Sequence, residues 1–220
     1  KHLTAKGSGT LGWTAVISIL ISLWSANGGV KAIFDALNIA YEEEEKRSFI
    51  TLNLQSLAFT AGALVFVVLA LTGIVVVPAV LQVLGLDEKA WYIALLRWPA
   101  LLAVLLFVLA LLYRYGPSRD APRWRWVTPG GMVAAFLWLA GSLLFSWYVS
   151  NFGSYDKTYG SLGAAIGFMT WIWISTTIVL VGAEINAEME HQTEADTTIG
   201  HEEPLGARDA RMADTVGAAS

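Results

Sequence analysis

Polar side chains recur at helical spacing along residues 27–42, in a pattern that could line a path for a solute. They are Asn27, Lys31, Asp35, Asn38 and Glu42. Lys31 and Asp35 are four residues apart, so a helix would let them pair and would lower the cost of removing each charge from water. Ionisable groups inside a membrane helix are functional candidates by default. The sequence favours the alternative, a helix that lies along the inner membrane surface with this stripe in the headgroup region.

The candidate polar path has seven residues: Asn27, Lys31, Asp35 and Asn38 from this stripe, together with Asn53, Gln55 and Glu184. Glu184 lies about 23 residues, or roughly 35 Å at about 1.5 Å per residue, from the start of the last long apolar segment. A buried carboxylate at that position could hold a proton or a cation. The sequence favours a different role, in which Glu184 lies at the inner surface and pairs with the arginines between residues 114 and 125.

Other patterns resemble catalytic or ligand-binding motifs but lack the context that those motifs need. Residues 7–12 match G-x-G-x-x-G, yet an apolar segment follows them and no strand-like segment precedes them. Glu188 and His191 form one E-x-x-H element, whereas a di-iron bundle needs two such elements and two further carboxylates. The acidic run Glu42–Glu45 is typical of a solvated helix end, although it could gather a divalent cation at a pore mouth. We expect no catalytic residue, no metal site and no cofactor, and the chain has no cysteine.

The composition indicates a membrane protein. Apolar residues make up 55% of the 220 residues and charged residues only 15%, against about 45–50% and about 25% in soluble domains. Runs without charge predict five spans, at about residues 11–41, 50–77, 91–113, 128–150 and 160–187, because about 20 apolar residues cross a membrane as a helix. Runs such as LLAVLLFVLALL do not alternate as barrel strands do. The expected fold is therefore an all-α, polytopic transmembrane helix bundle.

The basic residues predict how the spans face. With five spans, two basic loops fall on one side of the membrane, and that side should be cytoplasmic. They contain Lys46 and Arg47 in the first, and Arg114, Arg119, Arg123 and Arg125 in the second. We therefore expect the N-terminus of this chain to lie on the outer side of the membrane and the tail to lie in the cytoplasm. The four arginines should contact anionic lipid headgroups, and no segment is basic enough to indicate nucleic-acid binding.

The last thirty residues differ from the rest in charge. Residues 191–220 carry six acidic and two basic side chains, a net charge of −4, which equals the net charge of the whole chain. Residues 1–190 are therefore neutral overall. We expect 1–190 to form the helix bundle and 191–220 to be an acidic, disordered cytoplasmic tail.

Small residues four apart could mark close contacts between helices. Three such pairs lie in the apolar runs: Ala58 and Gly62, Gly130 and Ala134, and Gly163 and Gly167. Such pairs also arise by chance in apolar segments, so chance and a helix contact explain each pair equally well. Pro78 should bend or end the second span, because proline cannot donate a helical hydrogen bond.

Three stretches of the sequence resemble a known family. They are Leu96–Pro99 leading to Leu112–Pro117, then Trp124–Gly130, and then Phe145–Tyr155 continuing through Tyr159–Gly163 to Gly182–Glu188. Together they resemble the YihY/BrkB family of bacterial inner-membrane proteins, formerly labelled ribonuclease BN, from about residue 10 to residue 190. The resemblance implies six helices with both termini in the cytoplasm. The first of those helices is then expected to be missing from this chain.

The resemblance implies no settled activity. One branch of the family is linked by name to serum resistance and virulence, and the older label implies tRNA processing. A metal-dependent nuclease needs clustered acidic or histidine ligands, and an RNA-binding enzyme needs a platform outside the membrane. The sequence shows neither, so we do not expect an enzyme. We expect a transporter-like bundle for a small solute or a lipid; the alternative is a structural, envelope-integrity or virulence-associated protein, and a homo-oligomer is open to either.

Overall fold

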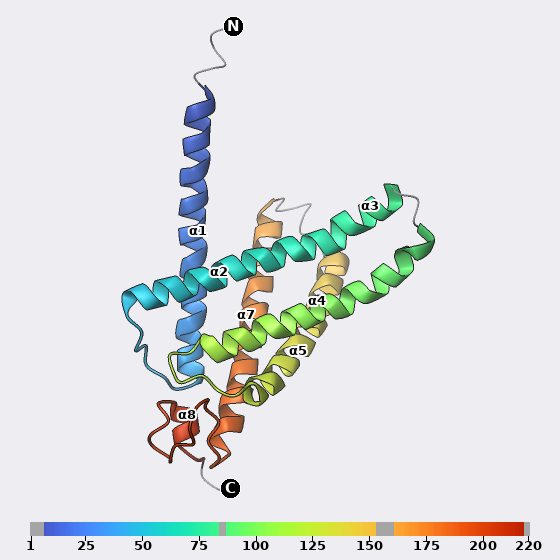
Figure 1. Cartoon of the computed structure of the whole chain (residues 1–220). Helices are drawn as coiled ribbons and strands as arrows, with labels where there is room; N and C mark the ends of the chain where they lie inside the picture. Colours follow the sequence, from blue (N-terminus) through green and yellow to red (C-terminus); the bar gives the residue numbers. More distant parts are fainter. Residues whose placement is uncertain (1–6, 84–86, 153–160, 218–220) are drawn as a thin grey trace.

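The computed structural model describes residues 7–83, 87–152 and 161–217, and these ranges contain helices, irregular segments and no strand (Figure 1). The elements are α1 (Gly7–Ala40), α2 (Phe49–Leu71), the π-helical segment η1 (Thr72–Val76), α3 (Val77–Val83), α4 (Asp87–Tyr115), α5 (Trp124–Phe152), α7 (Ser161–His191) and the short α8 (Arg211–Asp214). Five stretches are long and apolar enough to cross a membrane: Gly12–Ala40, Phe49–Val83, Trp98–Tyr115, Trp124–Asn151 and Leu162–His191. The predicted all-α, polytopic bundle is confirmed.

The second span is longer than the sequence predicted. Helix α2 continues through η1 and α3 to Val83, although Pro78 was expected to bend or end it. The chain accommodates the proline with a π-helical turn just before it, in which the N–H of Val77 donates to the carbonyl of Thr72, five residues back. A single π turn of this kind lets an α-helix continue past a proline that would otherwise interrupt its hydrogen bonds.

Helices α5 and α7 approach each other closely where two glycines face across the contact. A Cβ added at Gly182 would lie 2.7 Å from the backbone oxygen of Gly130 and 2.8 Å from the Cβ of Ala134. Further along, the indole N–H of Trp138 donates to Ser175 Oγ at 3.1 Å. The small-residue pair formed by Gly130 and Ala134 is therefore a helix contact. In the pair formed by Ala58 and Gly62, by contrast, a Cβ added at Gly62 would meet nothing within 4 Å.

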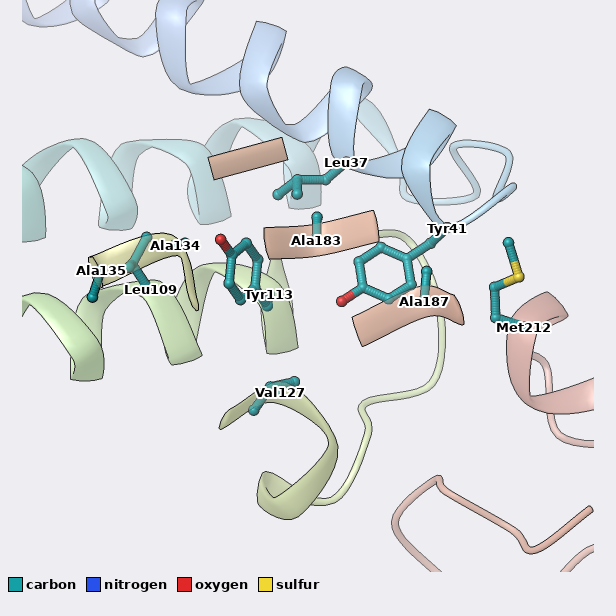
Figure 2. Close-up of a cluster of buried hydrophobic side chains, with 10 residues drawn as sticks. All are labelled: Leu37, Tyr41, Leu109, Tyr113, Val127, Ala134, Ala135, Ala183, Ala187 and Met212. Atoms are coloured by element: carbon teal, nitrogen blue, oxygen red, sulfur yellow. The ribbon is translucent and has the colours of Figure 1, made fainter. Parts of the chain in front are cut away.

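Buried apolar side chains from several helices pack into one core (Figure 2). It draws on α1, α4, α5, α7 and α8, with the residues Leu37, Tyr41, Leu109, Tyr113, Val127, Ala134, Ala135, Ala183, Ala187 and Met212. The Tyr113 hydroxyl donates to the carbonyl of Val179 at 2.8 Å, which joins α4 to α7. The connecting segments 41–48 and 116–123 and residues 192–217 all meet at one end of the bundle, which we call the tail-side end.

Away from the tail-side end, large apolar side chains are exposed. Trp13, Ile21 and Trp24 of α1 are 71%, 64% and 63% exposed. Monomeric soluble proteins rarely expose continuous apolar surface of this kind. The distribution is the one expected when lipid covers these helices.

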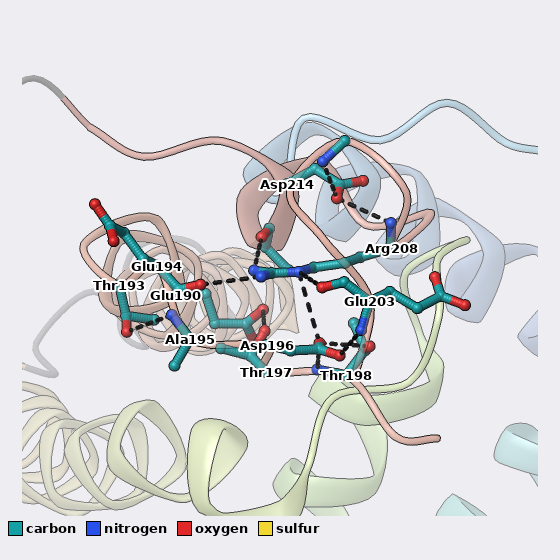
Figure 3. A network of polar contacts seen from close by, with 12 residues as sticks. Glu190, Thr193, Glu194, Ala195, Asp196, Thr197, Thr198, Glu203, Arg208 and Asp214 are labelled. Atoms are coloured by element: carbon teal, nitrogen blue, oxygen red, sulfur yellow. Dashed lines mark hydrogen bonds and ion pairs between the residues drawn. The ribbon is translucent and has the colours of Figure 1, made fainter. Parts of the chain in front are cut away.

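Residues 192–217 fold against the bundle, which differs from the disordered tail expected from composition (Figure 3). Arg208 is 4% exposed and donates to the carbonyls of Ala213 at 2.6 Å, Glu194 at 2.9 Å and Glu203 at 3.0 Å. An isolated bridge between Pro122 and Thr198 joins the tail to the segment before α5. The composition predicted disorder because a count of charges does not show that one arginine donates hydrogen bonds to three backbone carbonyls.

The Asp196 carboxylate is the centre of a second set of hydrogen bonds inside the tail. It accepts hydrogen bonds from the backbone N–H of Thr198 at 2.9 Å, the Thr198 hydroxyl at 2.8 Å and the backbone N–H of Glu203 at 3.1 Å. Burial disfavours the charged form, but these hydrogen bonds outweigh it and hold the pKa of Asp196 below its usual value. The acidic residues of the tail are thus partly used as acceptors within the fold.

Candidate functional site

A cavity of about 280 Å³ opens at the tail-side end, between the segment 41–48, the end of α4, the segment 116–123 and the tail. Basic residues dominate its lining: Lys46, Arg47, Arg114 and Arg119. Asp120, Asp209 and Gln55 also line it. The two basic loops that the sequence placed on one side of the membrane therefore meet around one cavity.

Arg47 joins the segment before α2 to the end of α4. Its guanidinium donates to both carboxylate oxygens of Glu45, at 2.7 and 2.6 Å, and to the carbonyl of Gly116 at 2.9 Å. It also donates to the Gln55 side-chain oxygen at 2.9 Å. The hydrogen bonds from Arg47 lower the pKa of Glu45 to about 2. This arginine has a full set of partners, so its role in the cavity wall is structural.

Arg119 forms a buried ion pair with Glu190 of α7. The guanidinium lies 2.8 Å from the carboxylate, and both side chains have no exposed surface. The Thr197 hydroxyl donates to the same carboxylate at 3.1 Å, and the guanidinium lies 4.5 Å from the centre of the Tyr41 ring. One pair thereby joins the segment 116–123, α7, the tail and the end of α1.

Arg114 differs from the other three cations. It is 7% exposed, and its Nε and Nη1 atoms are buried without a hydrogen-bond partner. Its guanidinium lies 4.3 Å from the ring centre of Trp124 and 5.4 Å from that of Tyr115. Within the described part of the chain, Arg114 has no carboxylate partner.

Asn186 of α7 forms hydrogen bonds with the backbone of α5 near the start of that helix. Its Oδ1 accepts from the N–H of Gly130 at 2.7 Å, and its Nδ2 donates to the carbonyl of Val127 at 3.2 Å. Pro129 lies between Val127 and Gly130 and has no N–H to donate. The fully buried amide of Asn186 therefore joins α7 to the backbone of α5 on both sides of this proline.

Replacing Asn186 with leucine should lower the free energy of unfolding by about 2–3 kcal/mol, because two buried backbone groups would lose a partner. Urea unfolding of the detergent-solubilised protein would measure the change. Asn151→Leu is the matched control, since Asn151 is exposed and bonds only within its own helix. Equal stability of the two variants would contradict the role assigned to Asn186.

The structure separates the members of the predicted polar path. The Lys31 amine donates to Asn53 Oδ1 on α2, whereas Asp35 is exposed and forms no ion pair with Lys31. Asn27 is 1% exposed, and its Oδ1 has no hydrogen-bond partner. Glu184 is exposed on α7 and is not among the residues that line the cavity.

Asn38 and Gln55, the other two path residues, lie at the tail-side end. Asn38 accepts from the N–H of Ser118 at 2.7 Å and donates to Glu45 at 3.1 Å. Gln55 lines the cavity and donates to the carbonyl of Tyr115. The structure thus places Lys31 in contact with Asn53. Of the seven predicted path residues, only Gln55 lines the cavity.

The four arginines of the second basic loop have different surroundings. Arg114 and Arg119 line the cavity. Arg123 donates to the carbonyl of Thr198 at 2.9 Å and so holds the tail. Arg125 is exposed, with its guanidinium 5.4 Å from the Trp126 ring centre.

Sequence reasoning missed the roles of Glu190 and Asn186. The expected pairing between a carboxylate at the end of α7 and the arginine loop exists, but the carboxylate is Glu190 and not Glu184. The available signal was the cluster of polar residues at 184–190, which did not tell which member faces inward. Over the residues that the structure describes, no group of three His, Asp or Glu side chains could hold a metal ion.

Comparison with known proteins adds relatives. The sequence model of a family described as virulence factor BrkB matches residues 1–206. The ribonuclease-like protein YfkH of Bacillus subtilis is 38% identical over 177 residues, which cover 77% of this chain and 63% of YfkH. A UPF0761 membrane protein of Aliivibrio salmonicida is 31% identical over 192 residues, covering 85% of this chain and 56% of the relative. The chain thus spans less than two thirds of either relative. No solved structure matches it significantly.

Proposed function

This chain belongs to the virulence factor BrkB family and is a multi-pass membrane protein, and from that premise we propose that it binds and moves, or senses, a small solute or a lipid. One observation carries the proposal: a cavity at one end of an apolar bundle is lined by four cations, of which Arg114 is buried without a carboxylate partner. Buried charge is expensive in such a protein and is typical of sites that handle a ligand.

A polar contact between α1 and α2 supports a path that leads from the bundle towards this cavity. Lys31 donates to Asn53 across the two helices, and Gln55, two residues further along α2, lines the cavity. Asn27 is buried one turn before Lys31 on α1 with an unsatisfied side-chain oxygen. The proposed path therefore comprises Asn27, Lys31, Asn53 and Gln55, and it leaves out the exposed Asp35 and Glu184.

The proposed setting is the bacterial inner membrane with the tail-side end in the cytoplasm. Lys46, Arg47 and the four arginines all lie at that end, which agrees with the excess of basic residues in cytoplasmic loops. Arg125 is exposed beside Trp126, and these two residues are suited to contact anionic headgroups at the membrane surface.

A structural or envelope-integrity role is the second candidate. The observation that favours it is the dense packing of the tail-side end, where the Arg119–Glu190 pair ties α7 to the segment 116–123 and, through Thr197, to the tail. The word virulence belongs to the name of the family, and the ribonuclease-like name belongs to YfkH. We propose neither activity for this chain.

Reconstitution into liposomes tests the proposal. We expect the wild-type protein to give saturable uptake of a solute, or scrambling of a labelled lipid, in a panel of phosphate, nucleotides, amino acids, sugars and phospholipids. Asn27→Leu and Lys31→Met should lower the rate at least about tenfold if the path between α1 and α2 is used. Asp35→Asn is the matched control on the same helix and should keep the wild-type rate. Wild-type protein that moves nothing in the panel, or equal rates in all variants, would overturn the proposal.

A further inference from the structure

The cations around the cavity at the tail-side end differ in how they are neutralised. Arg47 pairs with Glu45, Arg119 pairs with Glu190, and Lys46 pairs with Asp209. Arg114 has no such partner among the described residues, and it is more buried than Lys46, whose side chain is 47% exposed. Asp120 also lines the cavity, but it is exposed and forms no ion pair with Arg114 or Arg119. One buried positive charge therefore remains without a counter-charge.

The chemistry of Arg114 indicates what could supply that counter-charge. Nε and Nη1 of Arg114, and Nε and Nη1 of Arg119, are buried with no hydrogen-bond partner. The contacts of Arg114 with Trp124 and Tyr115 engage the face of its guanidinium, which offsets part of the desolvation cost but satisfies no N–H group. Arg119 has no exposed side-chain surface and is paired with Glu190, so an anion in the cavity would meet Arg114, whose planar N–H fork matches the oxygens of phosphate.

We infer that this cavity is a binding site for a phosphate group, held by Arg114 and Lys46. The volume of about 280 Å³ accommodates a phosphate or a phosphate monoester. The phosphate could belong to a lipid headgroup or to a free anion, since the cavity is at the ends of α2 and α4 where apolar segments finish. The inference deepens the proposed function, because it names the class of ligand.

Asp209 of the tail is the internal group that the phosphate would displace. Its carboxylate bonds to the Lys46 amine and lines the cavity, and its backbone has a φ of 45°, in the left-handed region. The Asp209 side chain is 65% exposed, so the pair with Lys46 is weak and can open at little cost. Lys46 also lies 3.5 Å from the buried carboxylate of Glu43, so displacement of Asp209 would remove one of its two carboxylate partners. The tail should therefore compete with the phosphate for Lys46.

The test measures binding without flux, using the full chain in dodecyl maltoside. The probes are inorganic phosphate, glycerol 3-phosphate and dioctanoyl phosphatidic acid, each against potassium chloride at matched ionic strength. A ligand that binds only the folded protein raises the midpoint of thermal unfolding in a saturable way. We expect such a rise with at least one probe, a loss of at least about tenfold in apparent affinity for Arg114→Gln, and a gain of several fold for Asp209→Asn.

The remaining arms separate the outcomes. Arg125→Gln changes an exposed arginine of the same loop that does not line the cavity. It should bind inorganic phosphate and glycerol 3-phosphate as the wild type does. Saturation by phosphatidic acid alone identifies a headgroup, whereas equal binding of all three probes identifies a free phosphate; either result supports the site. No rise beyond that of chloride, or undiminished binding by Arg114→Gln, would overturn it. If Arg114→Gln does not fold, an unchanged affinity in Asp209→Asn is the contradicting result. Binding without any flux would leave the site standing and remove the transport function.

Discussion

Replacing Arg119 with methionine should lower the free energy of unfolding by about 3–5 kcal/mol, because it leaves the Glu190 carboxylate buried and without its cation. Neither side chain has any exposed surface, so water cannot take over the role of the guanidinium. The Thr197 hydroxyl would remain as a donor to Glu190 at 3.1 Å, but one neutral hydrogen bond does not replace an ion pair. In a chain of this size, the loss corresponds to a fall of roughly 6–20 °C in the unfolding midpoint.

A double-mutant cycle shows whether the loss comes from the stranded charge. In Arg119→Met with Glu190→Leu, both charges are gone, and apolar side chains of similar volume fill the space. We expect this double variant to recover most of the stability, since replacing a buried pair with apolar groups is often neutral or stabilising. Arg125→Met, at an exposed position of the same loop, should change stability by less than about 0.5 kcal/mol. A single variant as stable as Arg125→Met would show that the pair is not formed in the protein.

The spans could be predicted from sequence because their signal is local. Four of the five spans contain a run of more than 20 residues without charge, and the remaining one contains the 16 residues from Trp98 to Tyr113. About 20 apolar residues cross a membrane as a helix. The boundaries were less exact where a local rule had an unforeseen solution. Pro78 is an example, since a π turn at Thr72–Val76 lets the helix continue through it.

The partners of the polar side chains could not be predicted, because they depend on how distant segments pack. The spacing of Lys31 and Asp35 suggested a pair within one helix, but Lys31 bonds to Asn53 on the next helix instead. Glu184 and Glu190 are both acids near the end of one apolar run, and nothing in their spacing shows that only Glu190 meets an arginine. The position of α7 against the segment 116–123 decides between them.

The tail illustrates the same limit from the opposite direction. Its acidic composition predicted disorder, since few apolar residues were available to form a core. The fold of residues 192–217 instead rests on Arg208, which bonds three carbonyls, and on Met212, which joins the core of the bundle. A tail of this kind acquires order from the surface on which it docks, and the sequence does not contain a description of that surface.

Replacing Gly182 with alanine should lower the free energy of unfolding by about 2–5 kcal/mol, because the new methyl group has no space between α5 and α7. The added Cβ would meet the Tyr113 hydroxyl, the Gly130 carbonyl oxygen at 2.7 Å and the Ala134 Cβ at 2.8 Å. A backbone oxygen cannot rotate away, so the helices must separate. Overpacking alone typically costs about 1–3 kcal/mol.

Separation of the helices would also weaken the hydrogen bonds that cross this contact, each worth about 1 kcal/mol. These are the bond from Tyr113 to Val179 and the two bonds that Asn186 makes to the start of α5. Gly131→Ala is the matched control, since Gly131 is next to Gly130 but its added Cβ would meet nothing within 4 Å. That variant should be neutral or about 0.5–1 kcal/mol more stable, because alanine favours the helix over glycine. Urea unfolding in detergent measures both variants, and similar stabilities would mean that α5 and α7 do not touch at these glycines.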